Sequence, residues 1–177
     1  MVGLGIAEPI VSLSEAQAYV RIETGEEEAV LAGLIRTASA VCEGFLNQVV
    51  IARSFEQDLP ASGVWSQVGA SPVRSITSVA LVDASGVSTA LPASGFAIDI
   101  DASGTGWVRL NSGVNVSRMR VAGSAGIASE QNGVPEPIRQ GVLRLVAHLF
   151  AARDGGDGAP PAAVTALWRP YRRNRLV

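Results

Sequence analysis

Apolar residues recur at helical spacing over residues 27–49, and this is the strongest structural signal in the sequence. The recurring positions are Val30, Leu31, Leu34, Ile35, Ala38, Val41, Cys42, Phe45, Leu46 and Val49. Intervals of three and four residues place such positions on one face of a helix. We therefore expect a long amphipathic helix here, packed into a core through its apolar face.

Two shorter signals indicate where helices begin in this first part of the chain. Ser12 and Glu15 have the spacing of a capping box, in which each side chain satisfies a backbone N–H at the start of a helix. Thr24 and Glu27 repeat that spacing just before the long helix. The first pair predicts a short helix over residues 13–21.

The apolar period changes to two after residue 50, which is typical of strands. Strand-like segments occur at residues 51–59, 73–82, 96–100, 107–110 and 116–121. The links between them are rich in Gly, Ser, Asp and Asn, which favour tight turns. The middle of the chain is therefore predicted to be a small antiparallel β region.

Helical spacing returns after Val134-Pro135-Glu136-Pro137, because Pro is tolerated in the first turn of a helix. This helix is expected to stop near Arg153, since the following Asp154-Gly155-Gly156-Asp157-Gly158 segment disfavours helix and is typical of a flexible link. A last short helix is predicted over residues 160–167. Pro170 is expected to end it.

Together these elements predict an α+β fold with an inserted β region. A small helical bundle, made of the long N-terminal helix and the C-terminal helices, is expected from residues 1–50 and 127–168. The antiparallel β region spans residues 51–126. Residues 169–177 are predicted to be an extended C-terminal tail without a core of its own, so we expect deletion after Leu167 to leave folding intact.

The composition excludes several kinds of enzyme. All 14 basic residues are Arg, so a Schiff-base lysine, a P-loop lysine and a lysine general base are all absent. The motifs G-x-S-x-G, G-x-G-x-x-G and H-E-x-x-H do not occur either. We therefore expect a structural protein with no catalytic residues and no cofactor, and an enzyme is the weakest alternative.

Three features with potential chemistry have structural interpretations. Cys42 has no partner for an internal disulfide and is expected to pack as a small apolar residue. His148, the sole histidine, lies beside an apolar helical stripe without a second ligand at suitable spacing. The Asp99–Gly104 segment imitates the start of an EF-hand loop, but Leu110 stands where a bidentate Glu is needed. We predict an ordinary turn there and no metal site.

The charge of the chain is distributed unevenly. The formal net charge is -2, yet the last ten residues contain Arg169, Arg172, Arg173 and Arg175 without any acid. Such asymmetry predicts a polar partner for the C-terminal end. The chain lacks the leader pattern of a secreted protein and the roughly 18 consecutive apolar residues of a spanning helix, so an intracellular product without membrane association is expected.

A series of short segments, in a fixed order, carries a family resemblance. They are Tyr19-Val20-Arg21-Ile22, the helix with Glu27, Ile35, Ala38, Glu43 and Phe45, Pro72-Val73 with Ile76 and Val79, Val121-Ala122-Gly123 with Gly126, Val134-Pro135-Glu136-Pro137-Ile138-Arg139, the helix to Phe150 and Arg153, and Leu167 with Pro170-Tyr171-Arg172. In this order and spacing the chain resembles the head-tail connector, or portal-docking adaptor, family of long-tailed phages and phage-derived gene transfer agents. Its large Gly- and Ser-rich β region departs from that family.

The resemblance implies a structural subunit of a virion or phage-like particle. Members of that family form rings, commonly of twelve copies, that dock on the capsid portal, and DNA passes through the channel without being specifically bound. The implied partners are the portal protein, neighbouring copies of the chain, and the next tail component, a stopper or tail terminator. The implied location is the head-tail junction, after a period in the host cytoplasm.

The resemblance also implies that the C-terminal segment reaches into the portal. The candidate docking residues are Trp168, Arg169, Pro170, Tyr171, Arg172, Arg173, Arg175 and Leu176. The two aromatic residues would anchor an arm hinged at Gly155–Gly158, and the Arg side chains would form forked bonds to carboxylates. Two other interpretations stay open for this tail: a solvated end and direct contact with DNA phosphates.

A second class of function also stays open. The Gly- and Ser-rich strands could instead form the binding surface of a β-domain module in a baseplate or a surface attachment structure. The helices would then only support that module.

Overall fold

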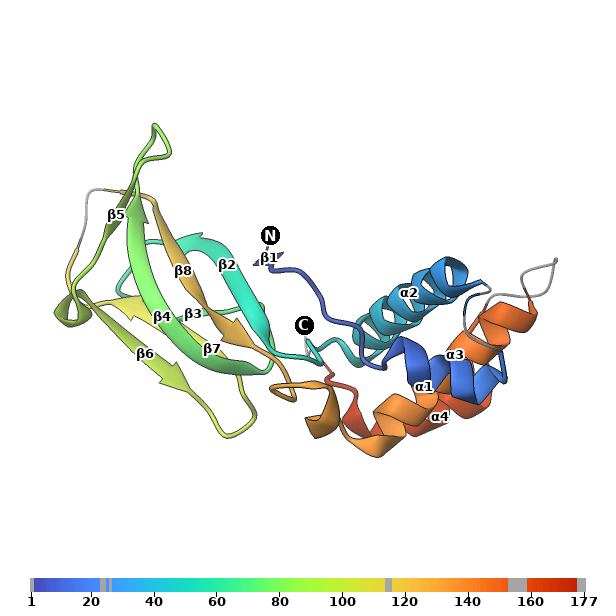
Figure 1. The fold of residues 1–177 in the computed structure, drawn as a ribbon. Coiled ribbons are helices and arrows are strands. Elements are labelled where there is room, and N and C mark those ends of the chain that lie inside the picture. The colour runs from blue at the N-terminus through green and yellow to red at the C-terminus, as the bar shows by residue number, and fades with distance from the viewer. Residues whose placement is uncertain (1, 23–24, 26, 114–115, 153–158, 175–177) are drawn as a thin grey trace. The chain divides into compact units, whose positions relative to one another are not determined.

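The computed structural model describes residues 2–22, 25, 27–113, 116–152 and 159–174 (Figure 1). The chain divides into two compact units. The β unit comprises residues 1–7 and 51–127, and the helical unit comprises residues 8–50 and 128–177. The predicted α+β class is confirmed, with antiparallel sheets in the first unit and helices in the second.

Two antiparallel sheets build the β unit. Its strands are β1 (Val2–Leu4), β2 (Arg53–Pro60), β3 (Ser66–Gln67), β4 (Val73–Val82), β5 (Ser88–Ala90), β6 (Phe96–Ile100), β7 (Gly106–Leu110) and β8 (Arg118–Ala125), and a 3-10 helix, η1 (Ala93–Gly95), precedes β6. The strand order is β1-β2-β8-β4-β5 in one sheet and β3-β7-β6 in the other. The five longer strands match the predicted segments, whereas β1, β3 and β5 are too short to show a period.

The first residues of the chain belong to the β unit, which corrects the assignment of all of residues 1–50 to the helical bundle. Val2, Gly3 and Leu4 pair with Gln57, Glu56 and Phe55 of β2. Their backbone groups supply the edge of the sheet. A three-residue edge strand is held by main-chain hydrogen bonds to its neighbour, and no side-chain pattern in the sequence indicates it.

The strand β8 lies at the centre of the five-stranded sheet, between β2 and β4. Its side chains alternate, so Met119, Val121 and Ala125 are buried on one face. Gly123 occupies the remaining buried position of that face. A Cβ atom there would overlap the Phe55 ring and the Ser75 carbonyl oxygen, which shows how closely the neighbouring strands approach.

The tetrapeptide Asp-Ala-Ser-Gly forms two matching turns, which begin at Asp83 and Asp101. In each, the Asp Oδ1 accepts hydrogen bonds from the hydroxyl and the N–H of the Ser and from the N–H of the residue after the Gly. The bonds from Ser103 and Thr105 lower the pKa of Asp101 to about 2. The prediction of an ordinary turn at Asp99–Gly104 is therefore confirmed.

The helical unit contains α1 (Leu13–Val20), α2 (Glu28–Leu46), α3 (Glu136–Ala151) and α4 (Ala162–Trp168), with 3-10 helices η2 (Gln131–Gly133) and η3 (Arg169–Tyr171). Helix α2 contacts α1, α3 and α4, and α3 contacts α1 and α4. The capping box of Ser12 and Glu15 is present as predicted. Cys42 is fully buried as expected, and burial raises the pKa of its thiol.

Helix α2 begins at Glu28 rather than at the second predicted capping box. Glu27 precedes it with φ 58, in the left-handed region, and caps no backbone group with its side chain. Thr24 lies outside the described residues. The Glu28 carboxylate instead accepts hydrogen bonds from the Gly25 N–H and the Gln17 side-chain amide, so an acidic residue still satisfies polar groups near this end of α2.

Trp168 is the largest fully buried side chain among the described residues. Its Nε1 donates a hydrogen bond of 3.2 Å to the Ile138 carbonyl oxygen, and its ring lies 5.8 Å from that of Phe45, centroid to centroid. The indole also lies directly against Gly141, which has no side chain to keep it away. The last residue of α4 therefore joins α2 and α3 into one core.

Changing Gly141 to Ala is expected to lower the free energy of unfolding by about 2 kcal/mol. The new Cβ would overlap the rigid indole of Trp168; overpacking of this kind costs about 3 kcal/mol, and the gain in helix propensity returns only about 1 kcal/mol. Urea denaturation followed by circular dichroism measures the change. Gly44→Ala is the matched control, because nothing lies within 4 Å of a Cβ at Gly44 and a small gain in stability is expected. Equal effects of the two changes would contradict the packing described.

Candidate assembly interface

The arginine-rich end of the chain is folded against the helical unit as far as it is described. After Trp168, the chain continues through η3 and runs along the C-terminal end of α2. The Arg173 N–H donates to the Leu46 carbonyl oxygen at 2.9 Å, and the Gln48 side-chain amide donates to the Tyr171 carbonyl oxygen. The Leu46 carbonyl is one of those left without a partner within the helix at its C-terminal end, so the segment satisfies it.

The exposed part of this segment is basic. Arg169, Pro170 and Arg172 are exposed, whereas Tyr171 and Arg173 are half-buried. The Arg172 guanidinium lies 5.2 Å from the centroid of the Phe45 ring, a cation–π arrangement that orients the charge without neutralising it. The structure therefore presents Arg169 and Arg172 to solvent from a fixed backbone.

The structure corrects the prediction of an arm that lacks a core. Trp168 is 0% exposed, so it is a core residue and not an available anchor. Helix α4 stops before Pro170, as expected, but the chain continues directly into the 3-10 helix η3, which contains Pro170. For the same reason, we now expect deletion after Leu167 to destabilise the helical unit, in place of the expectation that it leaves folding intact. Arg175, Leu176 and the proposed hinge at Gly155–Gly158 lie outside the described residues.

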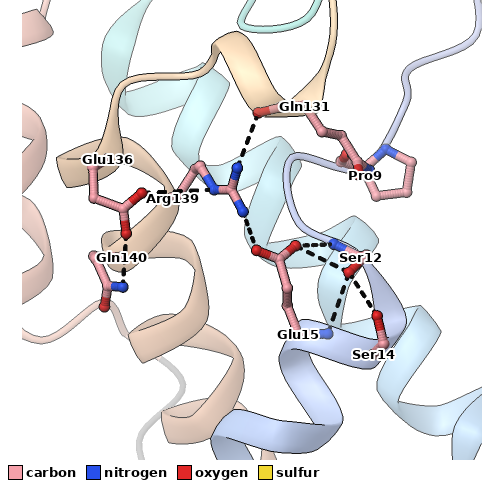
Figure 2. A network of polar contacts seen from close by, with 8 residues as sticks. All are labelled: Pro9, Ser12, Ser14, Glu15, Gln131, Glu136, Arg139 and Gln140. Atoms are coloured by element: carbon pink, nitrogen blue, oxygen red, sulfur yellow. Dashed lines mark hydrogen bonds and ion pairs between the residues drawn. The ribbon is translucent and has the colours of Figure 1, made fainter.

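A network of polar contacts fixes the start of α3 to the start of α1 (Figure 2). The Arg139 guanidinium pairs with the Glu15 carboxylate and donates to the Gln131 carbonyl oxygen at 3.3 Å. The Gln131 side chain in turn donates to the Pro9 carbonyl oxygen at 2.7 Å. The Glu15 carboxylate therefore takes part in the capping box of α1 and also forms an ion pair with Arg139 of α3.

The Glu15 carboxylate makes the stability of the helical unit depend on pH. Burial raises its pKa, but the hydrogen bonds from Ser12 and the charge of Arg139 outweigh that effect, so the pKa lies below its ordinary value of 4.5. A lowered pKa in the folded state means that the carboxylate stabilises the fold above pH 4.5, and that this contribution is lost as the pH falls through the folded-state pKa.

We expect Glu15→Gln to be less stable than the unchanged chain at pH 7 by about 1 kcal/mol, because Gln keeps a capping side chain and loses the ion pair with Arg139. The difference should shrink as the pH is lowered from 5 to 3, since protonation removes the same charge from Glu15. Urea unfolding of both proteins across this range measures it. A difference that stays constant with pH would contradict the role of the charge.

Two shallow depressions, of about 400 Å³ and 430 Å³, lie on the β unit. Glu56 is the one ionisable residue that lines the first, which lies over β1, β2, β4 and β8, and Glu56, Asp58 and Arg120 line the second. His148 is half-buried in the last turn of α3. The described residues contain no cluster of three His, Cys, Asp or Glu side chains that could hold a metal ion.

The three-stranded sheet carries an exposed aromatic and basic pair that the sequence patterns did not reveal. Trp65 is 41% exposed beside β3, and the Arg109 guanidinium of β7 lies 5.0 Å from the centroid of its ring. Val64, next to it, is 74% exposed. Exposed Trp and Arg are typical of protein interfaces, so the β unit also has a candidate contact surface.

Comparisons with known proteins find chains similar to this one in one kind of particle. No protein-family model matches the chain, and neither does any curated protein. The whole chain aligns with 97% of a chain from the neck of an empty gene transfer agent particle computed with C6 symmetry, with a TM-score of 0.81 and 28% sequence identity. It aligns equally completely with chains from the virion of a native gene transfer agent particle and from a native neck computed with C12 symmetry, with TM-scores of 0.79 and 0.78 and 27% identity in both cases. The chain is thus similar over its entire length, helical and β units alike, to a component of the neck of gene transfer agent particles.

Proposed function

We propose that this chain is a head-to-tail adaptor subunit of a phage-like particle, in which copies form a ring docked on the capsid portal, with a channel for DNA. The observation that carries the proposal is the similarity of the whole chain to components of gene transfer agent particles and their necks. The symmetries of the two neck structures, C6 and C12, are those of rings. The subunit is proposed to be structural and to have no catalytic activity.

The C-terminal segment supports docking on a portal through charge. Arg169 and Arg172 are exposed, and Arg forms forked bonds to carboxylates. The burial of Trp168 holds the backbone that carries them, so a partner gains these contacts at a reduced entropic cost. Arg175 and Leu176, outside the described residues, extend the same proposed docking segment.

DNA is proposed to pass through the ring without specific contacts. Exposed Arg side chains can also bind phosphates, but the formal net charge of the whole chain is -2. A negative subunit suits a conduit, because it does not retain its cargo. The next tail component is proposed to meet the ring on a surface other than the arginine-rich segment, and the Trp65–Arg109 pair is a candidate for that contact.

The baseplate or surface-attachment module is a weaker proposal. Its supporting observation is the exposed Trp65 with Arg109 on the β unit. The full-length similarity to neck components includes the helical unit, which that alternative treats as mere support. The adaptor proposal accounts for both units.

The location of the chain within purified particles distinguishes the two proposals. An epitope tag inserted at Gly86, in an exposed turn with no atom within 4 Å of its Cβ position, can be labelled with gold-conjugated antibody. We expect label at the junction of head and tail. Label at the distal end of the tail would support the baseplate module, and particles without label would contradict both.

A further inference from the structure

Helix α2 has a second apolar face that the core of the helical unit does not use. Its core-facing residues, including Leu31, Ile35 and Cys42, are buried. On the other side of the helix, intervals of three and four residues align a set that we term the open face of α2. The open face of α2 consists of Ala29, Val30, Gly33, Arg36, Thr37, Ala40, Val41 and Gly44.

The open face has few charges. Val30 is 47% exposed and Val41 is 36% exposed, and Gly33 is the one half-buried member of the set. Arg36 is the one charged residue within this stretch of exposed positions, and the carboxylate of Glu43 accepts the Val50 N–H. A helix on the surface of a monomer normally turns charged and polar side chains to the solvent.

The hydropathy of α2 leads to the same conclusion. An 18-residue window of α2 has a mean hydropathy of 1.5, yet only 33% of that window is buried within this chain. By length and composition alone, α2 would even qualify as a membrane-spanning helix. The core therefore accounts for only part of the apolar character of α2, and its exposed apolar residues indicate an interaction surface.

We propose that a second copy of this chain covers the open face of α2 in the assembled ring. This inference rests on the proposed function as a ring subunit, since similar chains stand in necks with C6 and C12 symmetry. In a closed ring, each subunit uses one surface to contact the neighbour on one side and a different surface to contact the neighbour on the other side. Each isolated subunit therefore leaves both of these surfaces uncovered, and one of them can be an apolar face.

The composition of the open face suits a protein neighbour of this kind. Gly33, Ala40 and Gly44 allow the neighbour to approach the helix backbone closely, and Val30 and Val41 supply apolar contact area along one flank of these small residues. DNA is a poor occupant, because a face with Arg36 as its one charge has little to bind phosphates. The portal is a poor occupant as well, because the proposed function assigns portal binding to the polar, arginine-rich C-terminal segment.

Charged substitutions test this surface. We expect Val30→Arg and Val41→Arg each to weaken ring assembly at least tenfold, measured as the concentration of subunit needed to form rings in sedimentation velocity with the portal protein present. Val87→Arg, at a position 60% exposed in the β unit, is the matched control and should assemble normally. Circular dichroism of each isolated variant separates loss of assembly from loss of folding.

Photo-crosslinking identifies the occupant directly. A photoreactive amino acid replaces Thr37, which is exposed within the open face, and assembled particles are irradiated. Crosslinks between copies of this chain support the proposal. Crosslinks to another particle protein or to lipid, or no crosslink at all, overturn it.

The result also separates this inference from the function on which it rests. If the unchanged chain forms rings at the portal and the two Arg variants do so equally well, the open face is not the subunit contact and the adaptor function stands. If the unchanged chain neither forms rings nor occurs at the neck, the adaptor function fails and the open face loses its proposed occupant with it.

Discussion

A chain truncated after Leu167 is expected to lose the stable fold of its helical unit. The deletion removes the indole of Trp168, which is 0% exposed and donates to the Ile138 carbonyl oxygen. Deleting a buried Trp side chain costs about 3–5 kcal/mol, and whole domains are stable by only about 5–15 kcal/mol. The deletion also leaves the Leu46 carbonyl without its bond from Arg173. Urea unfolding followed by far-ultraviolet circular dichroism measures the loss.

A shorter truncation provides the control for this experiment. Removing only the residues after Asn174 leaves Trp168, η3 and the Arg173–Leu46 hydrogen bond in place. That protein should unfold at nearly the same urea concentration as the full chain. Two truncations with the same midpoint as the full chain would show that Trp168 contributes nothing to the core, and would contradict the structure described.

Reversing the two exposed charges of the docking segment, as Arg169→Glu together with Arg172→Glu, is expected to abolish attachment to the portal protein. Each change replaces a forked donor by an acceptor and places a negative charge where carboxylates of the partner are proposed. Folding should be retained, since both side chains are exposed and the contact of Arg172 with Phe45 is worth only about 0.5–1 kcal/mol. Co-sedimentation with portal protein measures the attachment.

The control for charge reversal is Arg21→Glu with Arg144→Glu, which makes the same change in net charge at two other exposed positions of the helical unit. This protein should still bind the portal. Equal loss of binding in both double variants would indicate that only net charge matters. Duplex DNA binding with a steep dependence on salt, lost in Arg169→Glu/Arg172→Glu alone, would instead assign these residues to phosphate contact.

The regular elements of this fold were predictable from local signals. The capping box at Ser12 and Glu15, the periodic residues of α2 and the alternation of β8 each depend on neighbours in the sequence. The strands β1 and β3 were not predictable, because a two- or three-residue strand is defined by main-chain pairing with a distant segment.

The burial of Trp168 could not be seen in the sequence around it, because Pro170 and four Arg follow within seven residues. Its partner offered a clue, however. Gly141 lies within a helix that has no local need for glycine, and an isolated Gly in such a helix indicates a close approach by another group. Here that group is the indole of Trp168, 27 residues further along the chain.

The candidate interfaces were predictable only in part. The asymmetry of charge directed attention to Arg169 and Arg172, which are exposed. The open face of α2 was concealed, because Val30 and Val41 share their spacing with the buried residues of the same helix. Periodicity alone does not separate a helix with one apolar face from a helix with two, and only the packing of α1, α3 and α4 against α2 makes the distinction.

Electron microscopy of the purified protein mixed with portal protein shows whether this chain forms a ring on a portal. We expect rings of this chain stacked on the portal along a common axis, with a continuous central channel. Portal particles that remain undecorated at saturating concentrations of the folded chain would contradict it.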